Sequence, residues 1–102
     1  MPALHSREDW RQAHDELQER LVDWDPAGLV AAGGPPDEYF RLLFPLIRQL
    51  DAGAGAEEAA QWLVAELPLC FGATPPPAEV HAFARLTAKW FHARWPDFDA
   101  NS

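Results

Sequence analysis

Apolar side chains recur at intervals of three and four residues along four stretches of the chain, which is the spacing of one face of an α-helix. The pattern predicts helices at about residues 7–24, 37–51, 56–67 and 78–95. No stretch shows the strict alternation of apolar and polar residues that marks a half-buried strand. The sequence therefore predicts an all-α fold, a single small domain in which four helices form an irregular bundle.

The residues at the ends of these stretches are typical of helix starts and stops. Ser6 is a good N-cap for the first helix, and Asp37 can cap the second. The first helix should stop at Asp25-Pro26, because the residue before a proline is disfavoured in the α region. Pro68 is expected to end the third helix, because proline has no N–H to continue the hydrogen-bond ladder.

The second stretch is the most apolar of the four, with only a narrow polar strip. A helix that is apolar over most of its circumference belongs at the centre of a bundle, so we expect Leu43 and Phe44 in the core. In the fourth helix, the inward residues should include Phe83 and Phe91. Cys70 lies in an apolar stretch, and we expect it to be buried and unreactive, because burial raises the pKa of a thiol.

The charge of the chain is distributed unevenly. The 102 residues carry a net charge of -8, and residues 8–38 hold nine acidic and two basic side chains, a net -7. Such a surface repels phosphate backbones, which argues against nucleic-acid binding and favours a basic protein partner. Acidity also keeps a small protein in solution, and this second interpretation stays open.

No arrangement of side chains indicates an enzyme, a cofactor or a metal site. The four histidines form no i, i+4 pair, and a single cysteine permits neither an intramolecular disulfide nor a cysteine-based zinc site. The chain has no apolar run of membrane-spanning or signal-peptide length. We therefore expect a non-enzymatic protein without a cofactor, located in the cytoplasm and not bound to a membrane.

One constellation carries more specific information. Asp23-Trp24-Asp25-Pro26-Ala27-Gly28 is followed, nine residues on, by Asp37-Glu38-Tyr39 at the start of an apolar helix, and Gly55-Ala56-Glu57-Glu58 opens the next helix. This W-D-P-x-G and D-E-Y signature, within about residues 17–67, resembles that of a family of small bacterial helical proteins. Some members of that family resemble immunity proteins of contact-dependent growth inhibition. The resemblance implies a protein that neutralises a toxin delivered by a neighbouring cell.

The residues of this signature have both a structural and a functional interpretation. Asp25 and Asp37 can cap helices, Gly28 permits a turn with positive φ, and Tyr39 can pack its ring and hydrogen-bond its hydroxyl. In the functional interpretation, precise caps hold an acidic loop that faces a basic partner, a cognate toxin domain such as a nuclease. The candidate partner-binding residues are Glu16, Glu19, Asp23, Asp25, Asp37, Glu38 and Tyr39. The alternative is a structural or adaptor module that self-associates through an apolar helix face.

Overall fold

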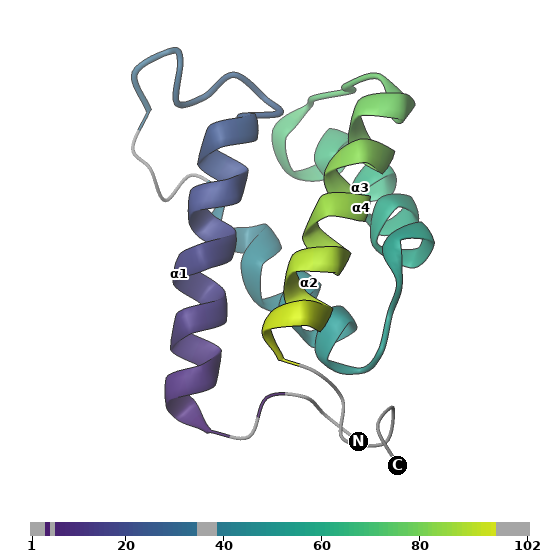
Figure 1. Cartoon of the computed structure of the whole chain (residues 1–102). Coiled ribbons are helices and arrows are strands. Elements are labelled where there is room, and N and C mark those ends of the chain that lie inside the picture. Colours follow the sequence, from purple (N-terminus) through teal and green to yellow (C-terminus); the bar gives the residue numbers. More distant parts are fainter. Residues whose placement is uncertain (1–3, 5, 35–38, 96–102) are drawn as a thin grey trace.

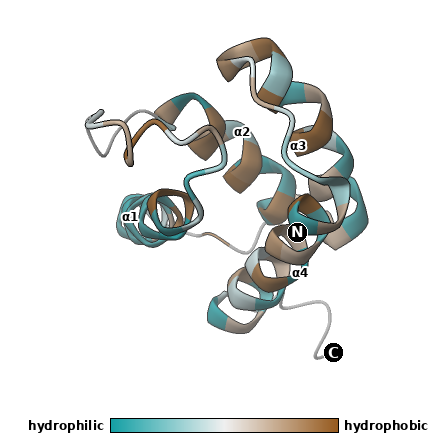
Figure 2. Ribbon diagram, turned by 90° about the horizontal axis from the view of Figure 1, so that it is seen from above, coloured by the Kyte–Doolittle hydropathy of each residue, from teal (hydrophilic) through white to brown (hydrophobic). Residues whose placement is uncertain are grey.

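A computed structural model of the chain describes residues 4, 6–34 and 39–95. This part of the chain forms four helices and no strand: α1 (Arg7–Trp24), α2 (Phe40–Asp51), α3 (Ala56–Phe71) and α4 (Pro77–Arg94). The helix α1 stands along one side of the molecule, α3 and α4 pack together on the other, and α2 lies between them (Figure 1). The hydrophilic side of α1 faces outward when the molecule is seen from above (Figure 2). The prediction of an all-α fold with four helices is confirmed.

The helix α1 has the bounds that its local sequence predicts. The Ser6 hydroxyl accepts a hydrogen bond from the Asp9 N–H at 3.1 Å, which satisfies one of the amide groups left open at a helix start. At the other end, Asp25 adopts a left-handed conformation with φ of 50°, and its N–H donates to the Leu21 carbonyl at 2.8 Å. Aspartate is one of the few residues other than glycine that tolerate this conformation. The helix therefore stops at Asp25, directly before Pro26.

The helix α2 is amphipathic rather than apolar all round. It buries a larger share of its residues than any other helix, namely Leu42, Leu43, Leu46, Ile47 and Leu50. The expectation that Phe44 lies in the core was wrong, because this side chain is 49% exposed, and Phe40 is 57% exposed. At 100° per residue both rings fall on the outer face, beside Arg41 and Arg48. The helix begins at Phe40, and the proposed cap Asp37 lies outside the described residues.

The helix α3 does not end at Pro68 as predicted but continues to Phe71. Pro68 removes one hydrogen bond in the last turns, yet packing on both sides of it keeps the chain helical. Leu67 is fully buried, and the Phe71 ring lies 5.2 Å from that of Tyr39, edge to face. The stop comes at Gly72, whose φ of 65° favours glycine and whose N–H donates to the Pro68 carbonyl at 2.9 Å.

Side chains from all four helices meet in one apolar core. The helix α4 begins with Pro77 in its first turn, a position that needs no N–H, and ends at Arg94, one residue before the predicted end. As expected, Phe91 is fully buried and Phe83 packs against the core while partly exposed. Among the described residues, no helix combines the length and the apolar character needed to cross a membrane.

Candidate functional site

The loop that follows α1 is organised around the carboxylate of Asp25. Its Oδ1 accepts hydrogen bonds from the Val30 N–H at 3.1 Å and from the Tyr39 hydroxyl at 2.6 Å. Its Oδ2 accepts from the Ala31 N–H at 2.9 Å. The Tyr39 hydroxyl in turn accepts from the Ala27 N–H at 3.0 Å. One aspartate and one tyrosine therefore join the two ends of the α1–α2 connection.

The protonation of this pair suits the hydrogen bonds it makes. The hydrogen bond from Tyr39 lowers the pKa of Asp25, and the backbone amides of the loop act in the same direction. Burial raises the pKa of Tyr39, and the neighbouring Asp25 carboxylate raises it further. At neutral pH, Asp25 is therefore an ionised acceptor and Tyr39 a protonated donor.

Two of the candidate partner-binding residues are thus engaged inside the molecule. Tyr39 is 1% exposed, so its ring offers no surface to a partner. The carboxylate of Asp25 binds the loop, as the structural interpretation of the signature supposes. Gly28 adopts a φ of 68°, the positive value expected at this turn. Asp37 and Glu38 lie outside the described residues, and their roles stay predictions.

Replacing Tyr39 with Phe should lower the free energy of unfolding by roughly 1–3 kcal/mol, because it removes a hydrogen bond to a charged group and leaves the Ala27 amide without its partner. Chemical denaturation at neutral pH measures the loss. A decrease below ~0.5 kcal/mol, the usual size of a surface effect, would contradict the role given to the hydroxyl.

The same variant should also change how stability depends on pH. The folded-state pKa of Asp25 is lowered, so its contribution is present above the unfolded-state pKa and is lost as the pH falls through the folded value. The pKa of Tyr39 is raised, so its contribution is present below the ordinary tyrosine pKa and is lost as the pH rises through the folded value. Tyr39→Phe should therefore reduce both the loss of unfolding free energy at acidic pH and the loss at alkaline pH.

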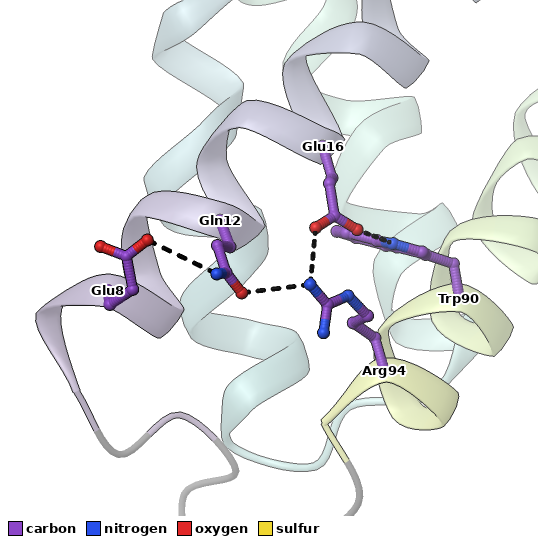
Figure 3. Close-up of polar contacts among 5 residues, drawn as sticks. All are labelled: Glu8, Gln12, Glu16, Trp90 and Arg94. Atoms are coloured by element: carbon purple, nitrogen blue, oxygen red, sulfur yellow. Dashed lines mark hydrogen bonds and ion pairs between the residues drawn. The ribbon is translucent and has the colours of Figure 1, made fainter.

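A third candidate, Glu16, connects two helices (Figure 3). Its Oε1 accepts from the Trp90 indole N–H at 2.9 Å, and its Oε2 lies 3.3 Å from Arg94 Nη2. The same Nη2 donates to the Gln12 side chain at 3.1 Å. The Glu16 side chain is 34% exposed, so it lies at the edge where α1 meets α4 and not on the open outer face of α1. Glu16 therefore helps to fix α1 against α4.

Two candidates remain on the outer surface of α1. Glu19 and Asp23 are exposed, as is Asp15, and the three residues follow one another at intervals of four along the helix. They line a shallow depression together with Gln18 and Val22. Asp15 was not among the candidate partner-binding residues, although its i, i+4, i+8 spacing with Glu19 and Asp23 places all three on one face of the helix. We call Asp15, Glu19 and Asp23 the acidic row.

A surface cavity of about 370 Å³ that is open to solvent lies between α1 and α4, and Asp23 of the acidic row belongs to its lining. Within it the Trp24 and Phe83 rings stack with centroids 4.3 Å apart, and the Trp24 indole N–H donates to Glu79 Oε1 at 2.7 Å. The cavity is lined by Arg20, Asp23, Trp24, Glu79, Ala82, Phe83, Leu86 and Thr87. The sequence pattern predicts Phe83 as an inward residue of the fourth helix, but it does not indicate that the Glu79 carboxylate accepts the Trp24 indole N–H.

Cys70 is partly buried, not fully buried as expected. Desolvation raises its pKa, and so does the nearby Glu66 carboxylate, whose Oε2 lies 3.5 Å from Sγ. Both effects favour the protonated thiol, which is the unreactive form. Within the described residues, no three His, Cys, Asp or Glu side chains are grouped so that they could hold a metal ion.

Neither the protein-family models, nor the curated proteins, nor the solved structures contain a match to this chain. The function of this chain therefore has to be inferred from its own sequence and contacts.

Proposed function

We propose that this protein is an immunity or antitoxin-like inhibitor, which binds and neutralises a bacterial toxin through an acidic surface. The observation that carries the proposal is the acidic row: Asp15, Glu19 and Asp23 are exposed together on the outer side of α1. A toxin that acts on nucleic acid has a basic cleft that attracts phosphates, and an acidic inhibitor would use the same field. The W-D-P-x-G and D-E-Y signature resembles that of small bacterial helical proteins, some of which resemble immunity proteins of contact-dependent growth inhibition, and this resemblance supports the same class.

The support of α1 by its neighbours suits such a role. The Glu16 contacts to Trp90 and Arg94 hold the middle of α1 against α4. The indole of Trp24 is bound to Glu79, and the Asp25–Tyr39 hydrogen bond fixes the chain directly after the helix. Carboxylates on a helix that is already ordered lose less conformational freedom on binding than carboxylates on a free loop, which favours affinity.

Co-expression with the neighbouring gene tests this function. We expect the reading frame immediately upstream to encode a basic toxin domain. Expressed alone in a susceptible cell, that domain should stop growth, and co-expression of this protein should restore it. The purified proteins should form a complex that calorimetry detects. The proposal fails if the two proteins form no complex and growth stays arrested.

A specific observation also favours the second candidate, an adaptor that self-associates through an apolar helix face. Phe40 and Phe44 are exposed on α2, and Phe44 lies in a groove with Arg7, Trp10, Arg11 and His14. Symmetric pairing across this groove would bring the arginines of two copies together, which is unfavourable and weighs against a dimer. Sedimentation equilibrium distinguishes the two: a dimer that Phe44→Ser dissociates supports the adaptor, and a monomer at all concentrations excludes it.

A further inference from the structure

The cavity between α1 and α4 combines an aromatic wall with two carboxylates. Trp24 and Phe83 form the wall, stacked at an angle of 20° between their planes. Leu86, which is 62% exposed, extends the apolar surface at the lining. Asp23 and Glu79 are both exposed residues of the same lining. An apolar surface beside exposed carboxylates suits a ligand that is apolar along its length and positively charged at its end.

The basic residue of the lining, Arg20, does not neutralise both carboxylates. Its guanidinium carbon lies 5.0 Å from the centroid of the Trp90 ring, in a cation–π contact outside the lining. Glu79 accepts the Trp24 indole N–H through Oε1. This hydrogen bond fixes the position of the carboxylate while leaving its charge in place. The lining therefore keeps a net negative charge next to its aromatic wall.

Thr87 gives an independent indication that this cavity takes a polar ligand. The residue lines the cavity and is only 1% exposed, yet its Oγ1 has no hydrogen-bond partner within the described part of the chain. A buried hydroxyl without a partner costs free energy. The oxygen itself is closed off in the observed rotamer, so the side chain has to turn to the second rotamer that threonine occupies in helices before a donor in the cavity can reach it.

We propose that the cavity receives an arginine side chain of a basic partner protein. The aliphatic stem of the arginine would pack on Leu86 and the aromatic wall, and its guanidinium would pair with Asp23 and Glu79. The inference rests on the proposed function, because it supplies the acidic surface with an anchoring pocket for a basic partner. Buried arginines are among the side chains that contribute most to protein–protein binding.

Arginine fits the lining better than the other basic or apolar side chains. Its planar guanidinium can stack on an aromatic ring and donate several hydrogen bonds in one plane, whereas the lysine ammonium is a strongly hydrated point charge. A purely apolar side chain would cover Asp23 and Glu79 and leave their charges desolvated without compensation. A phosphate would be repelled by the same two carboxylates.

Titration with a single amino acid derivative tests the cavity without the toxin. The probe is Nα-acetyl-arginine amide, and its uncharged isostere Nα-acetyl-citrulline amide is the matched control. The readout is the NMR signal of the Trp24 indole N–H, assigned through Trp24→Phe. We expect the arginine probe to shift this signal and to saturate with a dissociation constant in the millimolar range, whereas the citrulline probe leaves it in place. Equal responses to the two probes, or no saturation, would overturn the proposal.

Isosteric variants then test the two carboxylates. Asp23→Asn and Glu79→Gln remove charge and keep size, and the amide introduced by Glu79→Gln retains an oxygen that can accept the Trp24 indole N–H. Each variant should weaken the binding of the arginine probe about tenfold, the effect of one charge-assisted hydrogen bond. Glu57→Gln on α3, an exposed glutamate outside the cavity, is the control and should change nothing. Unchanged affinity in both cavity variants contradicts the proposal.

The outcome of the toxin experiment is independent of the outcome of the titration with the arginine probe. If the toxin domain binds and is neutralised while the probe does not bind, the cavity proposal is wrong and the proposed function stands. If the probe binds with the expected charge dependence while no toxin complex forms, the arginine site stands and the toxin assignment is wrong.

Discussion

Leu43→Ala should lower the free energy of unfolding by about 2–5 kcal/mol, the cost of emptying a fully buried leucine site. Leu43 is 0% exposed and lies on the core face of α2. The same change at the next residue, Phe44, should cost only about 1 kcal/mol, because the ring is half exposed and leaves no enclosed cavity. Urea unfolding of the two single variants measures both losses.

Adjacent positions on one helix make this a matched comparison. Helix propensity changes in the same direction at both sites, because leucine and phenylalanine are both replaced by the best helix former. A difference between the two losses therefore reports burial. Equal losses, or a loss at Leu43 below ~0.5 kcal/mol, would contradict the orientation of α2 in the core.

Phe44 shows why the sequence located α2 but not its orientation. The apolar letters of this segment surround most of the helix, so several rotations about its axis bury a similar number of them. Which face turns inward depends on where α1, α3 and α4 lie, and a single sequence does not contain that arrangement. In α1 the apolar face is narrower, and its buried residues Ala13, Leu17 and Leu21 follow one another at intervals of four, which defines a single inward face.

Helix ends were predictable where local chemistry decides them. Ser6 caps α1 through a hydrogen bond to a residue three positions away, and Asp25-Pro26 stops the helix within two residues. Pro68 is the opposite case, because the continuation of α3 depends on the contact of Phe71 with Tyr39, a residue far away in sequence. Tertiary packing there outweighs the local effect of proline.

In the candidate site, too, some features depend on the local sequence and others depend on tertiary packing. The aspartates and the tyrosine of the signature stand out in the sequence, and their chemistry fits both capping and partner binding. The bond between Asp25 and Tyr39 spans 14 residues, and the bond between Trp90 and Glu16 spans 74. Contacts of that range depend on the path of the whole chain. The sequence therefore showed which residues were candidates, and the fold showed that Glu16, Asp25 and Tyr39 make hydrogen bonds to other residues of the chain.

Reversing two charges of the acidic row should slow association with the toxin. In Asp15→Lys/Glu19→Lys the field that draws a basic partner to α1 is inverted locally, and we expect the association rate at low salt to fall roughly tenfold or more. Neither residue lines the arginine cavity, so the variant tests steering separately from anchoring. Stopped-flow or surface binding kinetics over a series of salt concentrations measures the rate.

Salt should have a smaller effect on the variant than on the natural protein. At physiological ionic strength the Debye length is ~8 Å, so charges farther apart no longer guide the encounter and the two association rates should converge. Dissociation should change less than association, because exposed charges at the edge of an interface mainly affect the encounter.

Glu57→Lys is the control for this series, because it reverses a charge on α3, a helix that carries no part of the acidic row. The Glu57 side chain is 71% exposed. Thermal melts of each variant confirm that it is folded. If Asp15→Lys/Glu19→Lys melts normally and associates as fast at low salt as the Glu57→Lys control, the acidic row does not attract the partner. Because the helix α4 carries Arg85 and Lys89 as exposed bases, its outer face would then be the next surface to test, with an acidic partner in place of a basic one.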